Sequence, residues 1–173
     1  MAKISALLIK RERYIERFDL LHSSTYAADD YSCAISLKTL ELLDVDQLRR
    51  GGEQGVWLID QLNQLSVEFP NVIADVRGRG LMIGVEFRPQ DESRSFVLRS
   101  LSSQKDLVLA VAGYLFNRHR IRVATTLSDP MTLRVQPSAI VSQADLQEFI
   151  DALRSVCELI NDADAPQLTS WKS

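Results

Sequence analysis

Three consecutive hydroxyl side chains, Ser23, Ser24 and Thr25, stand just before a stretch with helical periodicity. Hydroxyls and the free backbone N–H groups of a helix start together form a natural site for a phosphate group. A serine or threonine at this place can also simply cap the helix, because its oxygen accepts a hydrogen bond from the first turn. The local sequence favours the cap and leaves phosphate binding as the alternative.

Arg134 lies inside an apolar segment, residues 131–135, whose composition and length predict a strand. The planar guanidinium of an arginine binds a carboxylate through two parallel hydrogen bonds. In a strand with apolar neighbours, such a side chain either faces solvent or pairs with an anion. The solvent-facing orientation is the simpler interpretation of the residues alone, and carboxylate recognition is the alternative.

Other chemistry-bearing residues lack the spacing that their chemistry requires. The sequence contains no G-x-S-x-G, Walker A, H-E-x-x-H or C-x-x-C motif. His22 and His119 are far apart, and the adjacent Asp29 and Asp30 point to different sides of most backbones. Acidic residues at this place are typical of the first turn of a helix. We therefore predict no metal site.

The charge and the apolar stretches exclude several classes of function. The 173-residue chain has 20 basic and 23 acidic residues and a net charge of −3, whereas nucleic-acid binders usually have a basic excess. The RGRG sequence at 77–80 occurs once, between two predicted strands, and is more typical of a hairpin turn than of RNA binding. The longest apolar stretch is about half of the roughly 20 residues that a membrane-spanning helix needs. We expect neither nucleic acid nor a membrane as a partner.

Cys33 and Cys157 each lie in an apolar helical pattern, and we interpret them as two reduced, buried thiols. Such thiols indicate a reducing, cytoplasmic location. The first residues have too few apolar side chains before a charge cluster to form a secretory signal peptide.

The hydrophobic periodicity predicts the elements that would position these residues. In the first half we predict a buried strand at 4–9, a short helix or turn at 11–18, a polar loop at 22–30, a helix from residue 32, an interruption at 43–46, a second helix ending at Phe69, and a hairpin of strands 72–76 and 81–87. In the second half we predict a surface loop at 88–96, a helix at 98–116, strands at 121–123 and 132–135, a last helix from Ser142, and a frayed polar tail from Asn161. This order of strands and helices predicts an α+β or α/β fold rather than a helix bundle.

Two local patterns refine this prediction. Ser142 and Asp145 have the spacing of a capping box. Gly51, Gly52 and Gly55 weaken the first turns of the second helix and indicate a kink or a close contact there.

Three segments also have the pattern of one enzyme family. HSSTYAADDYSCAISLKTLELL (22–43) resembles the H-x-S-T-[YF] segment and following helix of class III, ornithine-aminotransferase-like, pyridoxal-phosphate enzymes. NVIADVRGRGLMIGVEF (71–87) resembles the hairpin V-x-D-V-R-G-x-G-L-M-x-G-V-E-F of that family. LRVQPSAIVSQADLQEFIDAL (133–153) resembles its C-terminal L-R-x-x-P-P-L-x-I-T-x-x-E-I-D segment. The three segments occur in the family's order and extend over most of residues 4–160.

The resemblance implies a fold, a cofactor and roles for three residues. The fold would be the C-terminal α+β domain of a fold type I pyridoxal-phosphate transferase, with the last elements of the α/β large domain. Ser24 and Thr25 match residues that hold the cofactor phosphate across a subunit interface, and Arg134 matches the arginine that binds the substrate carboxylate. The implied reaction transfers an amino group between an amine or amino acid and a carbonyl acceptor. The chain has Ala27-Ala28-Asp29-Asp30 where most members have Gly-Gly-Asn-Pro, which leaves the donor and the acceptor open.

The family lysine that forms a Schiff base with the cofactor lies upstream of the matching segments, in a glycine-rich context. None of the five lysines of this chain has that context: Lys3, Lys10, Lys38, Lys105 and Lys172. We therefore name no catalytic residue. We expect a C-terminal portion that is inactive without the upstream lysine-bearing segment. The expected partner is a second copy of the chain in a homodimer or the missing N-terminal portion. The alternative is a non-catalytic dimerisation or binding module.

The resemblance also predicts how the chain is divided. Residues 1–44 would form the end of the large cofactor-binding domain and the start of the connecting helix. Residues 45–162 would form the small domain, and residues 163–173 a tail.

Overall fold

A computed structural model describes residues 7–18 and 29–169, and the chain divides into two compact units, Met1–Asp46 and Gln47–Ser173. The elements of the first unit are the 3₁₀ helix η1 (Arg11–Arg13) and the helix α2 (Asp30–Leu42). η1 confirms the short helix or turn predicted at 11–18. Most of the predicted polar loop, including Ser24 and Thr25, lies outside the described residues.

The predicted buried strand at 4–9 is wrong in the part that the structure describes. Residues 7–9 belong to no strand, and Leu7 and Leu8 are 77% and 96% exposed. A strand needs a neighbouring strand to satisfy its backbone, and the described residues of the first unit contain no other strand.

The helix α2 ends where the sequence predicts and begins two residues earlier, at Asp30, but its apolar side chains are exposed. Asp29 caps it by accepting a hydrogen bond from the Ser32 N–H at 2.9 Å. Leu37 and Leu40 are 63% and 68% exposed. The thiol of Cys33 is half-buried, so the prediction that this cysteine is buried is wrong. Periodicity predicted the helix, and whether its apolar face is covered depends on packing that periodicity does not report.

The second unit combines one sheet with most of the helices. Its elements are α3 (Val45–Glu68), β1 (Ile73–Arg79), β2 (Met82–Phe87), α4 (Phe96–Ser103), α5 (Leu107–His119), β3 (Ala124–Thr125), β4 (Thr132–Val135), α6 (Gln143–Asn161) and α7 (Ala165–Thr169). The four strands form an antiparallel sheet in the order β1-β2-β4-β3. This mixed architecture confirms the predicted fold class.

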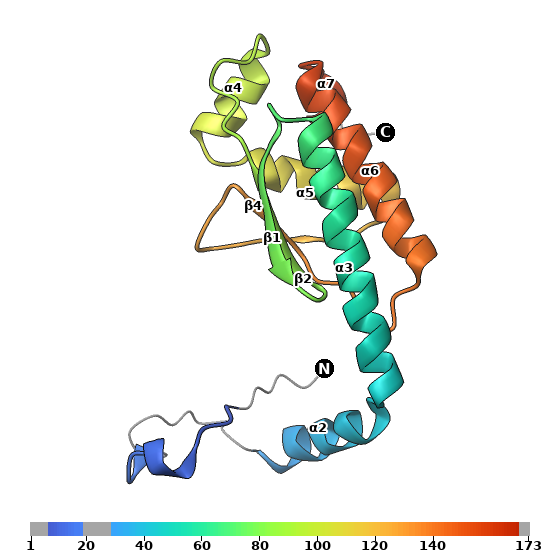
Figure 1. Ribbon diagram of the computed structural model, residues 1–173. Coiled ribbons are helices and arrows are strands. Elements are labelled where there is room, and N and C mark those ends of the chain that lie inside the picture. Colours follow the sequence, from blue (N-terminus) through green and yellow to red (C-terminus); the bar gives the residue numbers. More distant parts are fainter. Residues whose placement is uncertain (1–6, 19–28, 170–173) are drawn as a thin grey trace. The chain divides into compact units, whose positions relative to one another are not determined.

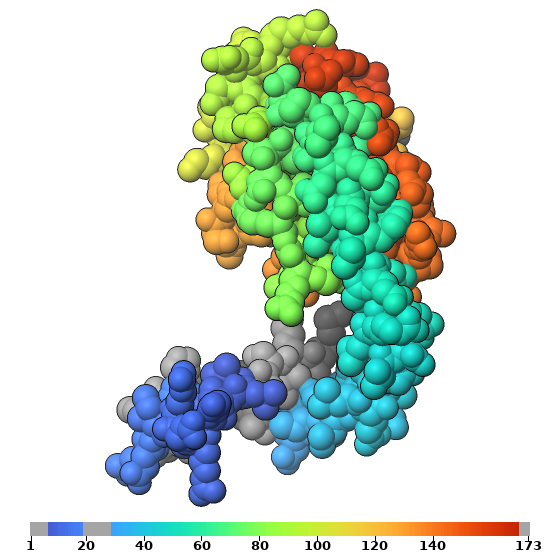
Figure 2. Space-filling model, in the orientation of Figure 1, coloured from blue at the N-terminus to red at the C-terminus, as the bar shows by residue number. Residues whose placement is uncertain are grey.

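One face of the sheet packs on the helices to form the core. Along β2, Ile83, Val85 and Phe87 are buried and alternate with more exposed residues, because successive strand side chains point to opposite faces. The buried stripe of α3, every third or fourth residue from Leu58 to Phe69, joins the same core. Figure 1 shows α3 and α6 on the same side of the β1–β2 hairpin, and in Figure 2 the atoms of α3 and the hairpin lie against each other.

The hairpin is confirmed, but its turn lies later than predicted. Arg79 pairs with Met82, so the turn consists of Gly80 and Leu81, and Gly80 adopts the left-handed φ of 56° that glycine tolerates. Gly55 of α3 approaches this turn so closely that a Cβ atom there would lie 2.4 Å from the carbonyl carbon of Gly80. This confirms the predicted close contact of the glycine-rich helix start.

Two left-handed residues change the elements predicted between 98 and 123. Lys105 has a φ of 61°, and the Asp106 N–H donates to the Leu101 carbonyl at 2.8 Å. This bond is typical of a helix end and divides the predicted single helix into α4 and α5. Arg120 also has a φ of 61° and terminates α5. The predicted strand at 121–123 is therefore wrong, and β3 begins at Ala124.

The C-terminal elements confirm one prediction and correct another. Ser142 and Asp145 form the predicted capping box at the start of α6, with Asp145 N–H to Ser142 Oγ at 3.1 Å and Ser142 N–H to Asp145 Oδ2 at 3.3 Å. The stripe of α6, including Cys157, is buried as predicted. The frayed tail is wrong over 165–169, because α7 forms there and buries Ala165 and Leu168.

Candidate functional site

The outer face of the sheet, which points away from the helices, places Arg134 in the open. Leu133 and Val135 are buried on either side of Arg134 in β4, while Arg134 itself is exposed. Its partners in the neighbouring strands are Gly84 of β2 and Ala124 of β3. The solvent-facing orientation predicted for Arg134 is therefore correct, and its two direct neighbours carry no side chain beyond a methyl group.

A second arginine on the same face is surrounded by acceptors; we call this group the Arg77 cluster. Arg77 Nη1 donates to Asp75 Oδ2 at 2.9 Å and to Glu86 Oε2 at 2.5 Å. Arg77 Nη2 donates to Thr132 Oγ1 at 3.1 Å and to Asp129 Oδ2 at 3.4 Å. The hydrogen bonds to Asp75 and then Glu86 raise the pKa of Arg77. The cluster neutralises this guanidinium and joins β1, β2 and the start of β4.

Asp129 fixes the loop that leads into β4. Its carboxylate accepts the Met131 N–H at 3.0 Å and the hydroxyl of Thr132, and its carbonyl accepts the Thr126 hydroxyl at 2.5 Å. The hydrogen bond from Thr132, followed by that from Met131 and the charge of Arg77, lowers the pKa of Asp129. Strand β4 therefore starts at Thr132, two residues before Arg134, and the Thr132 hydroxyl is bonded to the carboxylate of Asp129.

Arg134 has no such compensation. Within the described ranges its guanidinium makes no hydrogen bond and no ion pair. An exposed guanidinium with small neighbours is accessible to a planar anion and matches a carboxylate through two parallel hydrogen bonds. This geometry is compatible with the carboxylate recognition that the sequence left as the alternative.

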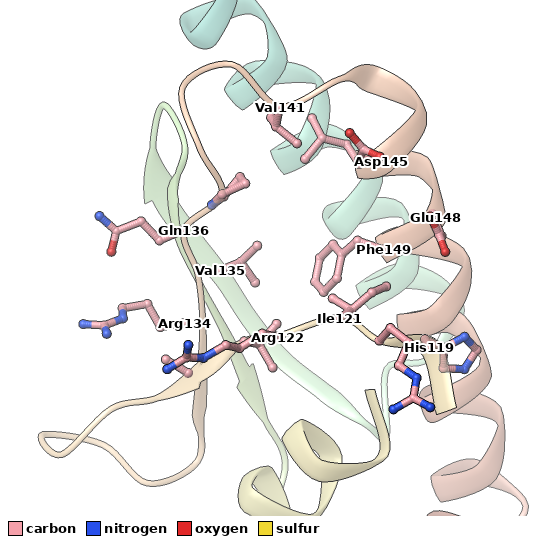
Figure 3. Close-up of a pocket in the computed structure, with 15 residues that line it drawn as sticks. His119, Ile121, Arg122, Arg134, Val135, Gln136, Val141, Asp145, Glu148 and Phe149 are labelled. Carbon is pink, nitrogen blue, oxygen red and sulfur yellow. The ribbon is translucent and has the colours of Figure 1, made fainter. Parts of the chain in front are cut away.

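A groove of about 620 Å³ lies on the other side of β4, between this strand and α6. Val135, Ile121 and Phe149 point into it, as Figure 3 shows. Arg134 and Gln136 border the groove, but in Figure 3 their side chains extend away from Phe149. The groove and the guanidinium of Arg134 are therefore on different sides of the strand.

The lysines in the described ranges do not fit a site for the aldehyde of a cofactor. Lys10 lies 3.9 Å from Glu12, and Lys38 donates to Glu41 at 2.9 Å. Lys105 is exposed at the break between α4 and α5. Ser24 and Thr25, to which the resemblance assigns the phosphate, lie outside the described residues, so their role stays a prediction.

The described residues contain neither a metal-binding cluster nor a membrane-spanning helix. No group of three or more histidine, cysteine, aspartate or glutamate side chains in this part of the chain is placed to hold a metal ion. None of the helices described is long and apolar enough to cross a membrane.

The sequence alone does not predict the Arg77 cluster, because residues 77–80 have the pattern of a turn. The sequence does contain a signal. Asp75 and Arg77 are two positions apart in one strand, so their side chains share a face of the sheet, and Glu86 pairs with Asp75 from the next strand and lies on the same face. Asp129 gave no such signal, because its partners come from the loop and from another strand.

The comparisons with known proteins agree with this fold. The sequence pattern of the family described as aminotransferase class-III matches residues 3–157. An uncharacterised aminotransferase of Schizosaccharomyces pombe is 31% identical over 154 residues, which are 88% of this chain and 31% of the relative. The chain thus spans about a third of the length of this curated relative.

Solved structures with the same fold include two aminotransferases. Lysine aminotransferase from M. tuberculosis matches with a TM-score of 0.61 and 20% identity, over 84% of this chain and 32% of that chain. Ornithine aminotransferase from Plasmodium yoelii matches with a TM-score of 0.59 and 18% identity, over 80% of this chain and 32% of that chain.

Proposed function

The chain belongs to the class III aminotransferases, and from this premise we propose that it forms the C-terminal part of a pyridoxal-phosphate-dependent enzyme. The enzyme would transfer an amino group between an amine or amino acid and a carbonyl acceptor. The cofactor, when bound, supplies the electron sink for this chemistry, and the protein supplies binding and orientation.

The observation that carries the proposal is the uncompensated guanidinium of Arg134 on the open face of the sheet. Its strand is anchored by Asp129 and Thr132, so its position is fixed while its hydrogen-bond donors stay available. In the proposed function Arg134 binds the carboxylate of the amino acid or of the carbonyl acceptor. This contact would orient the substrate and would take no part in bond breaking.

The remaining roles follow from the family resemblance. Ser24 and Thr25 would hold the cofactor phosphate of a partner subunit in a homodimer, and the lysine that the reaction needs would come from another segment. The free thiols of Cys33 and Cys157 support a reducing, cytoplasmic location.

A second candidate function is favoured by α2. Leu37, Leu40 and Leu42 of this helix are each more than 60% exposed. Exposed leucines on one short helix suit a dimerisation or binding module derived from the family without catalysis.

Incubation of the purified chain with pyridoxal phosphate, followed by borohydride reduction and peptide mapping, tests the proposal. For the purified chain we expect weak cofactor binding and no stoichiometric label on a lysine. In the full-length enzyme we expect Thr25→Ala to weaken cofactor affinity by about 1–3 kcal/mol, because hydrogen bonds to a charged group are lost. Labelling of one lysine together with amino-group transfer would show that the chain is complete by itself. Absence of any cofactor affinity would favour the non-catalytic module.

The genomic sequence immediately upstream of Met1 separates the two candidates independently. The proposed enzyme requires a lysine in a K-x-x-G-G context there or in a partner chain. A non-catalytic module requires neither.

A further inference from the structure

Two arginines on the outer face of the sheet lie within reach of one carboxylate. In β2, Gly84 pairs with Arg77 of β1 on one side and with Arg134 of β4 on the other. Glu86 lies two residues after Gly84, so its side chain shares this face and is a diagonal neighbour of both arginines. Diagonal neighbours in an antiparallel pair lie about 7–8 Å apart, a separation that long side chains bridge. Glu86 can therefore reach either guanidinium.

In the structure Glu86 binds Arg77 and leaves Arg134 free. Glu86 Oε2 accepts a hydrogen bond from Arg77 Nη1 at 2.5 Å, and this carboxylate has no other partner within the described ranges. Arg134 makes no hydrogen bond and no ion pair with any residue in these ranges. The partner that Glu86 takes thus decides whether the donors of Arg134 are available to a ligand.

The other acceptors around Arg77 explain why Glu86 binds this arginine. Arg77 Nη1 also donates to Asp75 at 2.9 Å, and Nη2 donates to Thr132 at 3.1 Å and to Asp129 at 3.4 Å. These acceptors belong to β1, to β4 and to the loop before β4. The side chain of Arg77 therefore extends across β2 and is held on both sides of this strand.

Loss of Arg77 would release Glu86 in particular. The carboxylate of Asp129 keeps two other donors, one in its own loop and one in β4. Asp75 lies on β1, and β2 separates it from Arg134. Glu86 alone would lose its one partner while a free guanidinium lies diagonal to it, and opposite charges at such positions attract each other. An ion pair between Glu86 and Arg134 would then compete with any carboxylate ligand.

We propose that Arg77 keeps Arg134 available to the substrate carboxylate by holding Glu86 away from it. Arg77 is then a positioning residue, which acts through Glu86 and does not touch the substrate. This inference rests on the proposed function, because it takes Arg134 as the group that binds the substrate carboxylate.

The test is a titration of the full chain with valerate, a monocarboxylate, followed by the arginine side-chain signals in NMR spectra. We expect Arg77→Gln to weaken valerate binding about two- to fivefold, the effect of one exposed ion pair that competes for Arg134. A further Glu86→Gln substitution should restore the native affinity. The matched control adds Asp75→Asn instead: this double variant has the same net charge, and its affinity should stay as low as that of Arg77→Gln.

The two double variants separate this role from a merely structural one. A loss of affinity that neither of them restores, or that both restore equally, would overturn the inference, and so would unchanged valerate binding in Arg77→Gln. No effect of Arg134→Gln on valerate binding would instead contradict the carboxylate role in the proposed function, and this inference with it.

Glu86→Gln alone tests the inference with Arg77 in place, so the result does not depend on the folding of Arg77→Gln. Because Arg77 holds Glu86 in the native chain, this substitution should shift the Nε–H signal of Arg77. The signal of Arg134 and the affinity for valerate should stay nearly unchanged. A shifted Arg134 signal together with tighter valerate binding would show that Glu86 already binds Arg134, which would overturn the inference.

Discussion

Arg77 and Arg134 occupy the same row of the sheet, separated by Gly84 of β2. Arg77 is held by three carboxylates and a hydroxyl, and its donors are used within the fold. Arg134 has the same chemistry and none of these partners in the described part of the chain. Substitutions at Arg134 should therefore change carboxylate binding alone, whereas substitutions at Arg77 should also change stability.

Replacement of Arg134 by lysine tests whether the shape of the guanidinium matters. Lysine keeps the positive charge but cannot form two parallel hydrogen bonds with a carboxylate. We expect Arg134→Lys to weaken valerate binding about three- to tenfold without changing the free energy of unfolding by more than about 0.5 kcal/mol. NMR titration and urea unfolding measure the two quantities. Unchanged valerate affinity would mean that charge alone is recognised.

Asp129 should matter for stability, because its carboxylate and carbonyl hold the loop before β4. We expect Asp129→Ala to lower the free energy of unfolding by about 1 kcal/mol, the usual cost of losing such hydrogen bonds at a partly exposed site. Ser128→Ala, an exposed position in the same loop, is the control and should leave stability unchanged. A similar loss in both variants would indicate a general effect of the loop.

The carboxylate of Asp129 should also make the free energy of unfolding depend on pH. Hydrogen bonding to Thr132 lowers the pKa of Asp129 in the folded chain, so its contribution is complete above its ordinary value near 3.8. The contribution is lost as the pH falls below that value and through the folded-state pKa. Urea unfolding at pH 7 and pH 3 should therefore show a smaller difference between the native chain and Asp129→Asn at pH 3. A difference that is independent of pH would contradict this assignment.

At the scale of elements, the contact between α3 and the hairpin turn offers a matched pair of substitutions. A Cβ atom at Gly55 would lie 2.4 to 2.6 Å from backbone atoms of Gly80, whereas one at Gly52 would meet nothing within 4 Å. We expect Gly55→Ala to destabilise the chain by about 1–3 kcal/mol through overpacking. Gly52→Ala should be neutral or stabilising by up to about 1 kcal/mol, because alanine favours the helix. Urea unfolding of both variants measures this, and equal effects would contradict the close contact.

Elements with a strong period or a local capping signal could be predicted from the sequence. The stripe of α6 and its capping box at Ser142 and Asp145 are both present in the structure. The break between α4 and α5 could not be predicted, because lysine rather than glycine adopts the left-handed conformation at 105. The position of β3 could not be predicted either, because it depends on where α5 ends.

Some residues of the candidate site can be predicted from the sequence, and others cannot. The guanidinium of Arg134 in an apolar strand is visible in one segment of sequence, and so is its solvent-facing orientation. The Arg77 cluster unites β1, β2 and the loop before β4, whose residues are far apart in the sequence. Such groupings depend on the register of the sheet, which hydrophobic periodicity does not determine.

At the scale of the whole molecule, the core formed by the described residues lies within the second unit. The buried core residues run from Leu58 to Leu168, and all of them belong to Gln47–Ser173. We therefore expect a fragment of residues 45–173 to fold by itself, with a thermal midpoint within about 5 °C of that of the full chain. Calorimetry provides the measurement. A broad, non-cooperative transition of the fragment would show that the first unit is needed for folding.

Cys33 belongs to the first unit and Cys157 to the second, so the reactivity of each thiol tests one unit. Burial raises the pKa of the Cys157 thiol to about 12, so it is protonated and shielded in the folded chain, whereas Cys33 is half-buried. At pH 8 we expect iodoacetamide to modify Cys33 in the native chain and Cys157 only after unfolding in urea. Peptide mapping identifies the modified residue. Modification of Cys157 under native conditions would show that α6 opens from the core.

The contact between Gly55 and Gly80 also restricts where residues can be inserted into the chain. The hairpin turn has two residues and lies directly against the backbone of α3, so an inserted residue would have to displace the helix. The segment between β2 and α4 has no such constraint from α3, and surface loops of this kind tolerate insertions. Members of this family that gain residues in this domain should therefore gain them after Phe87 rather than between Arg79 and Met82. A library of single-residue insertions, scored for soluble expression, would show this asymmetry.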